Sequence, residues 1–479
     1  MAKPRAKQAG KIDCVHGRVN EPEFNIAQVR ERFLLVINPS SPRRLRRVRE
    51  DKLRLVMLAV AAAALAPSTS WTARPQPSVT EVRIDKTRID RALAVMVRDA
   101  RAVGVSALVW KDGRESYYGS AGYADREARR PMRRDTLVQI WSMTKPVTGV
   151  AMMQLWEQGK FQLDDPLSDY LPEYADTKVF AGIDASGKPI LKAPRRPILV
   201  RDILRHTAGF GEGPPESYPQ KMLAAADPLN LDNSLPEFSR KLASVPLVYE
   251  PGTQWRYSWA VDVQAALVEK LSGQTFETYV RQHIFEPLRM KDTAWTQPEE
   301  RFSRLATAYS KGPDGKLHRK SEADIRRMNF APRKLTRGGA GLVSSLDDYM
   351  RFARMLLGQG ALDGVRILKP STVKLMSTDQ LDPAIRDRSW LRDKSNGGFG
   401  MDFAVRTGRS LEAKENRGTV GEFFWDGAWS TLFWVDPANR LITVYFVQSD
   451  PFDGSLHRDI RRAVYGDDYV GPKGDEASH

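Results

Sequence analysis

Residues 136–156 read TLVQIWSMTKPVTGVAMMQLW, and this stretch places the hydroxyl of Ser142 three residues ahead of the amine of Lys145. The residues before Ser142 predict an extended segment, and the apolar positions after Pro146 recur at helical spacing. Residues three apart share one face of a helix, so Lys145 can hydrogen-bond the Ser142 hydroxyl. The start of a helix also favours the negative charge that develops during acyl transfer. The pattern predicts an activated serine at the start of a buried helix.

A second Ser-x-x-Lys match, from Ser371 to Lys374, has different surroundings. Ser371 follows Pro370 in a polar segment, where serine is the ordinary N-cap of a short surface helix. We therefore expect Ser142, and not Ser371, to be the nucleophile.

The order of predicted elements indicates an α+β fold. A helix is predicted over residues 84–103, and residues 143–300 are predicted to be mostly helical, with a Pro-rich loop or small helical insertion over 211–244. The other predicted elements are strands 105–110 and 116–123, helices 261–271, 276–285 and 346–357, strands 399–405, 430–435 and 441–447, and a last helix over 456–464. We expect one sheet completed by both ends of the chain, with a helical region inserted.

The first 73 residues differ in composition from the rest. Seven basic residues between positions 43 and 54 precede an apolar run over residues 55–66, a pattern typical of a secretory signal. The apolar run is too short to span a bilayer core of about 30 Å as an anchor. The predicted organisation is an extension over 1–50 that is disordered or not part of the mature protein, a signal-like segment over 51–73, one domain over 74–468 and a polar tail over 469–479.

The signal-like segment predicts a periplasmic or secreted protein with no stable membrane span after signal removal. Residues 1–73 carry 14 Lys+Arg and 6 Asp+Glu, so 14 − 6 = +8 of the formal net charge of +15 lies in the part expected to be removed. The remaining charge is modest and is not clustered with stacking aromatic residues, so we expect no nucleic-acid partner.

Cysteine and histidine usage excludes several kinds of chemistry. The only cysteine, Cys14, lies in the extension, so the mature protein is expected to have neither a disulfide nor a thiol nucleophile. The six histidines are scattered without metal-ligand spacing. We expect neither a metal nor a cofactor.

Tyr257 is the candidate third member of the site. It lies in the turn 251–258, ahead of a helix that begins near Trp259. A tyrosine held near a cationic amine loses its proton more readily, which makes it a candidate acceptor for the serine proton. The other interpretation is a tyrosine that anchors its loop through a hydrogen bond, and position alone favours that one.

Six stretches in chain order extend the pattern. They are Ser142-Met143-Thr144-Lys145, LRHTAGF at 204–210, PGTQWRYS at 251–258, PLRMKDT at 287–293, GGAGL at 338–342 and WDG at 425–427. Together they resemble the serine hydrolases related to class C β-lactamases, a group that also holds D-alanyl-D-alanine carboxypeptidases and family VIII carboxylesterases. The resemblance covers residues 84–466.

The resemblance implies a β-lactamase/transpeptidase-like α+β fold, in which an antiparallel sheet is flanked by N- and C-terminal helices around an inserted, mostly helical region. It implies that Ser142 is the nucleophile, that Lys145 and Tyr257 share general-base work, and that water releases a covalent acyl-enzyme. The oxyanion is then expected to bind the backbone N–H groups of Ser142 and Ala428.

His206 invites comparison with a Ser-His-Asp triad. The resemblance implies instead that the stretch around His206 is structural. Because Lys145 and Tyr257 already fill the role of base, we do not expect His206 to be catalytic.

Departures from the family pattern bear on the substrate. Trp425 stands where β-lactamases and carboxypeptidases usually carry Lys or His, and Trp259 stands where β-lactamases carry Asn. A Trp-led third motif is similar to that of family VIII esterases, although Asp426 replaces their common glycine. We hypothesise that Asp426 disfavours anionic acids; the alternative is a side chain in solvent or paired with Arg417. The residues expected to contact the substrate are Trp425, Asp426, Gly427 and Trp259.

These observations predict an exported serine hydrolase that cleaves carboxylic esters. One alternative is hydrolysis of an amide, by a D-alanyl-D-alanine carboxypeptidase, a peptide hydrolase or a weak β-lactamase. Another is a non-catalytic relative that binds cell-wall fragments or a protein, although the intact set of Ser142, Lys145 and Tyr257 argues against it. The expected partner is a small-molecule ester or amide.

Overall fold

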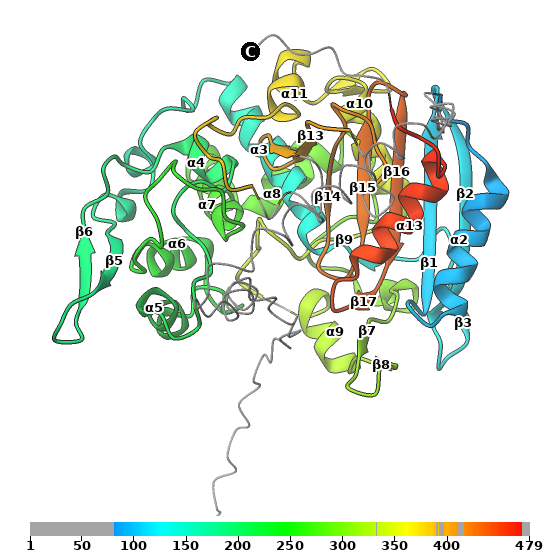
Figure 1. Ribbon diagram of the computed structural model, residues 1–479, viewed down its shortest axis with the longest axis horizontal. Coiled ribbons are helices and arrows are strands. Elements are labelled where there is room, and N and C mark those ends of the chain that lie inside the picture. The colour runs from blue at the N-terminus through cyan, green and yellow to red at the C-terminus, as the bar shows by residue number, and fades with distance from the viewer. Residues whose placement is uncertain (1–80, 332, 389–390, 392–396, 410–415, 472–479) are drawn as a thin grey trace, which may run out of the picture. The chain divides into compact units, whose positions relative to one another are not determined.

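Both ends of the chain contribute strands to one antiparallel sheet (Figure 1). The computed structural model describes residues 81–471 except 332, 389–390, 392–396 and 410–415. The predicted extension 1–50, the signal-like segment 51–73 and most of the polar tail lie outside the described residues.

The eight strands of the sheet run in the order β12 (Gly397–Phe399), β13 (Ala404–Arg406), β14 (Phe423–Asp426), β15 (Leu432–Asp436), β16 (Leu441–Val447), β1 (Gly104–Lys111), β2 (Arg114–Asp125) and β3 (Arg130–Pro131). The pairing of β1 with β16, from Val105 opposite Val447, joins the two ends of the chain within the sheet. Every residue of β16 is buried, as expected for a strand covered on both faces. The predicted antiparallel sheet completed by both chain ends is confirmed.

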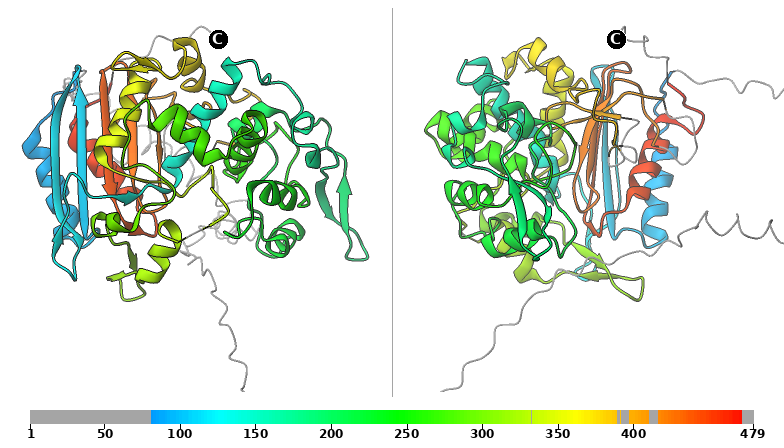
Figure 2. Two further views of the ribbon diagram at one scale, coloured as in Figure 1. Left: turned by 180° about the vertical axis from the view of Figure 1, so that it is seen from behind. Right: turned by 60° about the vertical axis from the view of Figure 1, so that its left-hand side comes forward.

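Helices cover both faces of this sheet (Figure 2). α2 (Lys86–Arg98) and α13 (Gly454–Tyr465) lie side by side on one face. α10 (Leu346–Leu357) packs against β15 and β16 on the other face. The apolar positions of these helices are buried at helical spacing, so each helix has one stripe against the sheet.

A mostly helical region is inserted between the N- and C-terminal strands. It opens with the 3₁₀ turn Trp141–Thr144 and α3 (Lys145–Glu157), in which ten of 13 residues are buried, so α3 is a central helix. α7 (Ala260–Ser272) packs against α3. The region also contains α4 (Val200–Leu204), α5 (Tyr218–Ala226), α6 (Leu235–Ala243), α8 (Phe276–Val280) with its π-helical continuation Arg281–Phe285, the 3₁₀ turns Leu167–Asp169, Pro172–Tyr174 and Glu299–Arg304, and the hairpin of β5 (Val179–Ile183) and β6 (Pro189–Lys192).

Shorter elements complete the described chain. β4 (Val138–Gln139) pairs with β9 (Val343–Ser344) directly ahead of Ser142. The others are the sheet of β17 (Ser449–Asp450), β7 (Tyr309–Lys311) and β8 (Leu317–Arg319), the pair β10 (Ala361–Leu362) and β11 (Val365–Arg366), and the helices α9 (Glu322–Asn329) and α11 (Pro370–Met376). None of the described helices is long and apolar enough to cross a membrane.

Two local predictions are wrong. The single strand predicted over 399–405 is a hairpin of β12 and β13, because the chain reverses where the N–H of Gly400 donates to the carbonyl of Phe403 over 2.8 Å. Ser371 does not cap α11; Lys369 is the N-cap, and Ser371 lies in the first turn. Ser371 and Lys374 are both exposed, so the second Ser-x-x-Lys match lies on the surface.

Candidate active site

Ser142 follows a short strand that the glycine-rich run 338–342 holds in place. Beside the β4–β9 pair, the N–H of Ile140 donates to the carbonyl of Leu342 over 2.9 Å. The backbone of Trp141 then takes a φ of +49°, in the left-handed region that bulky residues rarely adopt. Such strained residues occur at functional sites, where the surrounding structure holds them. This turn starts the 3₁₀ segment that carries Ser142.

The side chains of Lys145 and Tyr257 both reach the hydroxyl of Ser142. Lys145 Nζ lies 3.1 Å from Ser142 Oγ, and Tyr257 OH lies 2.6 Å from the same oxygen. Lys145 Nζ also lies 4.6 Å from the centre of the Tyr257 ring. The structure therefore brings together the three side chains predicted to be catalytic, although Tyr257 lies 115 residues after Ser142.

The local backbone explains why Lys145 meets Ser142. The sequence predicts both residues on one α-helix, whereas the structure places Ser142 in the 3₁₀ turn and begins α3 at Lys145. A 3₁₀ helix has three residues per turn, so the side chains of residues i and i+3 eclipse one another. The predicted contact between the two side chains is present, but the turn that makes it is tighter.

The amine of Lys145 is buried and hydrogen-bonded. Lys145 is 5% exposed, and its Nζ donates to the carbonyl of Gly339 over 2.7 Å. Burying a polar group without such a partner is unfavourable. The neighbouring Gly338 packs so closely on α7 that a Cβ there would lie 2.2 Å from the carbonyl oxygen of Val261. The glycine-rich run thus supplies a carbonyl to the site, a role that the sequence analysis did not assign.

His206 holds the loop that carries Tyr257. The N–H of Ser258 donates to His206 Nδ1 over 3.2 Å, and the N–H of Arg256 donates to the His206 carbonyl over 3.1 Å. The imidazole is buried, and its centre lies 5.1 Å from that of the Tyr257 ring. These contacts fit the structural role that the resemblance implies for His206.

The turn after β14 lies against the backbone just ahead of Ser142. A Cβ on Gly427 would lie 2.6 Å from the carbonyl oxygen of Ile140 and 2.2 Å from Thr431 Oγ1. Only glycine allows this approach. Ala428, which follows, is exposed. The turn that carries the Ala428 amide therefore packs against Ile140, two positions before Ser142 in the chain. That the amides of Ser142 and Ala428 bind one oxyanion stays a prediction.

The two tryptophans predicted to contact the substrate have different surroundings. Trp425 is 1% exposed, and its ring centre lies 5.6 Å from that of Tyr257 and 5.5 Å from that of Phe399. The structure thus assigns Trp425 to the support of the Tyr257 ring. Trp259 is partly exposed and borders an apolar pocket. The other lining residues include Phe210, Pro219, Leu223, Leu242, Val245 and Val248.

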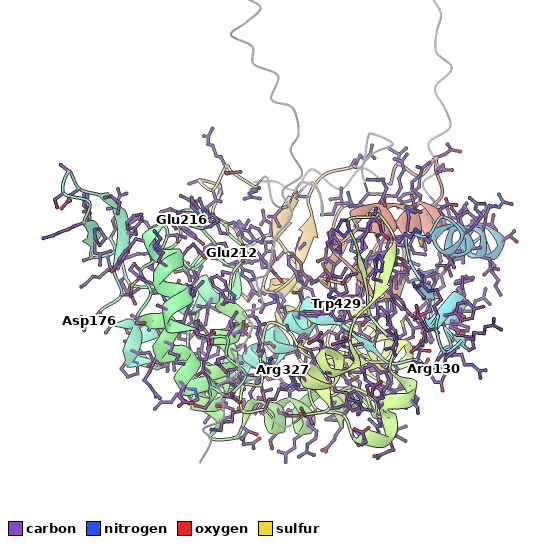
Figure 3. All side chains as sticks on the ribbon, turned by 90° about the horizontal axis from the view of Figure 1, so that it is seen from below. Arg130, Asp176, Glu212, Glu216, Arg327 and Trp429 are labelled. Atoms are coloured by element: carbon purple, nitrogen blue, oxygen red, sulfur yellow. The ribbon has the colours of Figure 1, made fainter. Side chains whose placement is uncertain are left out.

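A second pair of tryptophans includes the residue directly ahead of Ser142. Trp141 directly precedes Ser142, and its ring centre lies 4.6 Å from that of Trp429. Seen from below, Trp429 lies between Glu212 of the helical region and Arg130 at the far side of the sheet (Figure 3). Aromatic rings therefore lie at the boundary between the sheet and the helical region, beside Ser142.

Asp426 points away from the face occupied by Trp425. Its Oδ2 lies 3.9 Å from Nδ1 of His457 on α13, and its side chain is 6% exposed. Neighbouring residues of a strand point to opposite faces, which sends Trp425 toward Tyr257 and Asp426 toward α13. The direct effect on anionic substrates predicted for Asp426 conflicts with this placement, and so does the alternative of a carboxylate in solvent or paired with Arg417.

Two buried carboxyl groups near Lys145 were not among the residues predicted for the site. Asp262, in the first turn of α7, accepts the N–H of Gly339 over 3.1 Å. Asp402 lies between β12 and β13, and burial raises the pKa of its carboxyl well above the usual range, against the opposing effects of Gln264 and Lys145. No local pattern marks either residue, because both reach the site through tertiary contacts. Among the described residues, no group of three or more His, Cys, Asp or Glu side chains is placed to hold a metal ion.

Comparison with known proteins identifies the family of the chain. Residues 89–466 match the Beta-lactamase family. Protein Rv1367c of Mycobacterium tuberculosis is 34% identical over 367 residues, which span 76% of this chain and 89% of that protein. Esterase EstB of Burkholderia gladioli is 30% identical over 405 residues, which span 79% of this chain and 94% of EstB. The solved structure of EstCE1, a hydrolase with promiscuous acyltransferase activity, matches with a TM-score of 0.65 and 27% identity over 79% of this chain and 98% of that chain.

The fit of Gly427 against Ile140 gives a test of the oxyanion prediction. In Gly427→Ala the added methyl group would clash with the carbonyl oxygen of Ile140 and with Thr431 Oγ1, so the turn must move and carry the Ala428 amide with it. Loss of one oxyanion donor typically lowers kcat by about 10²–10³-fold, and we expect a loss of that order in ester hydrolysis. Gly454→Ala is the control, since a Cβ there meets only Phe452 at 3.5 Å. Full activity of a folded Gly427→Ala protein would contradict the assignment.

Proposed function

Because the chain belongs to the β-lactamase family and is a serine hydrolase, we propose that it cleaves carboxylic esters through an acyl-enzyme on Ser142. The observation that carries this proposal is the contact of both Lys145 Nζ and Tyr257 OH with Ser142 Oγ, at 3.1 and 2.6 Å. Both groups lie within reach of the proton that the serine must lose. The relatives named as an esterase and as a hydrolase support the reaction class.

In the proposed acylation step, Ser142 Oγ attacks the carbonyl carbon of the ester while its proton passes to the pair of Lys145 and Tyr257. The carbonyl oxygen becomes an oxyanion that accepts the N–H groups of Ser142 and Ala428. When the bond to the alcohol oxygen breaks, the pair returns its proton to that oxygen, and the alcohol leaves. The serine then carries the acyl group as an ester.

Deacylation uses the same groups in reverse. A water molecule attacks the acyl carbon and gives a proton to the pair of Lys145 and Tyr257. The bond between the acyl carbon and Ser142 Oγ breaks, the proton returns to Oγ, and the carboxylic acid leaves. Because Lys145 and Tyr257 both contact Oγ, either side chain can carry the proton in each step.

The tryptophans of the site favour neutral esters. Trp425 packs behind Tyr257 at the position where related β-lactamases place a cation or donor, and Trp259 borders an apolar pocket where they place an amide. Neither position therefore offers the charged group or the amide of those β-lactamases, which suits an uncharged acyl or alcohol group. Hydrolysis of an amide is the second candidate, and the match to the β-lactamase family is the observation that favours it. The intact contacts of Ser142 argue against a relative that only binds its ligand.

The preference for esters predicts the outcome of a substrate panel. We expect turnover of p-nitrophenyl esters to exceed that of a chromogenic cephalosporin and of a D-Ala-D-Ala peptide by at least about 10²-fold in kcat/KM, a difference of about 3 kcal/mol in transition-state stabilisation. Initial rates measured with one purified preparation give the comparison. Faster turnover of the peptide or the cephalosporin would replace the esterase assignment with amide hydrolysis.

The role of Lys145 predicts the behaviour of a matched pair of variants. Lys145→Ala removes both the positive charge and one proton acceptor, so we expect kcat for ester hydrolysis to fall by about 10³-fold or more. Lys374→Ala changes the exposed lysine of the second Ser-x-x-Lys match and should leave kcat unchanged. Labelling by a fluorophosphonate probe should persist in Ser371→Ala and disappear in Ser142→Ala. Near wild-type kcat in Lys145→Ala would remove Lys145 from the mechanism.

We further propose that the protein is exported, because a basic flank and a short apolar run occupy the segment 51–73. Mass spectrometry of protein recovered from the periplasm or the culture medium should then find an N-terminus near Ala66 or Ala73. Recovery of the intact chain from the cytoplasm alone would contradict export.

A further inference from the structure

Asp262 and Asp402 lie near Lys145 but differ in their hydrogen-bond partners. Asp262 accepts the N–H of Gly339, and Arg337 lies 3.3 Å from both of its carboxylate oxygens. A carboxylate that accepts an amide and a guanidinium is stabilised in its charged form. The side chain of Asp262 is only 2% exposed, so its charge acts inside the protein.

Asp402 is held differently. One of its oxygens accepts the side-chain amide of Gln264 over 3.1 Å. The other oxygen has no hydrogen-bond partner among the residues that the structure describes. Burial raises the pKa of this carboxyl, against the opposing effects of Gln264 and Lys145. Of the two carboxyl groups, Asp262 is therefore the one that a guanidinium and a backbone amide hold near Lys145.

One peptide group connects Asp262 to Lys145. The N–H of Gly339 donates to Asp262 over 3.1 Å, and the carbonyl of the same residue accepts from Lys145 Nζ over 2.7 Å. A Cβ on Gly339 would lie 2.9 Å from Asp262 Oδ2 and 3.3 Å from Lys145 Nζ, so the carboxylate and the amine approach each other across this glycine. Hydrogen bonds in such a chain polarise one another.

We propose that Asp262 is a positioning residue whose charge, acting through Gly339, sets the pH at which Lys145 and Tyr257 can accept the Ser142 proton. Arg337 opposes this effect, because its guanidinium partly neutralises the Asp262 carboxylate. The inference rests on the proposed function of Ser142 as a nucleophile. It adds a residue that contacts neither the serine nor the substrate.

The sign of the effect follows from the charges around the amine. Lys145 and Tyr257 must together give up one proton before they can accept another from Ser142, and they titrate as a coupled pair. A negative charge nearby favours the protonated pair, so Asp262 raises the pH at which the pair becomes active. Arg337 lowers that pH. Asp402, whose pKa burial raises, packs against Gly149 of α3, and the buried His206 lies beside the Tyr257 ring.

The test is the pH dependence of fluorophosphonate labelling in the full-length protein, measured as a second-order rate constant so that no substrate has to be known. We expect the rising acid limb of the wild-type profile to move to lower pH by about one unit in Asp262→Asn, the size expected for one unit charge in a partly polar interior. Asn keeps an acceptor for the Gly339 N–H, so a purely structural role would leave the limb in place. Arg337→Gln should move the limb to higher pH.

Asp402→Asn is the matched control, since it changes a second buried carboxyl that makes no hydrogen bond to Gly339 among the described residues, and its limb should stay in place. An unmoved limb in Asp262→Asn, or an equal shift in Asp402→Asn, would overturn the proposal. If Asp262→Asn fails to fold, Arg337→Gln becomes the deciding variant. An acid limb that stays in place or moves to lower pH in Arg337→Gln would then overturn the proposal. Absence of labelling at Ser142 in the wild-type protein would instead overturn the proposed function.

Discussion

A buried amine is the constraint on which the Ser142 site depends. Moving such a group out of water costs several kcal/mol unless hydrogen bonds replace the lost solvent. Lys145, which is 5% exposed, gains the carbonyl of Gly339, the hydroxyl of Ser142 and the face of the Tyr257 ring. These partners come from three segments of the chain, so α3, the loop before α7 and the glycine-rich run must pack together to bury the amine. The packing of the helical region therefore also determines the position of the Ser142 hydroxyl.

The sheet contributes the other half of the site through the end of β14. This strand lies between β13 and β15, so its ladder determines where the turn at Gly427 and Ala428 lies. That turn contacts the carbonyl of Ile140, which lies between β4 and the 3₁₀ turn that carries Ser142. Small displacements matter at such a junction, since a misplacement of about 1 Å can cost about 10²-fold in rate. The antiparallel ladder and the absence of a side chain at Gly427 together hold this turn against the carbonyl of Ile140, two residues before Ser142.

Local periodicity predicts the parts of this fold that local interactions determine. The helix over 346–357 and the strand over 441–447 were predicted residue for residue, because their buried positions recur at the helical period or form one continuous apolar run. The contact between Ser142 and Lys145 was predicted for the same reason, since three residues bring side chains together in either kind of helix. The prediction of a single strand over 399–405 is wrong. The composition of this segment suits a strand, but Asp402 takes a φ of +61° in a reversal that tertiary contacts hold.

Three aspartates near the site show where inference from sequence stops. Asp262, Asp402 and Asp426 each stand in apolar stretches, and nothing in their spacing distinguishes them. In the structure Asp262 is paired with Arg337 and a backbone amide, and Asp426 lies beside His457 behind the sheet. Asp402 is buried, and one of its oxygens has no hydrogen-bond partner within the described part of the chain. The charge of a carboxyl group depends on the donors that the tertiary structure brings to it. The sequence around Ser142 is therefore enough to predict a nucleophile there, whereas the electrostatics around its hydroxyl belong to the folded chain.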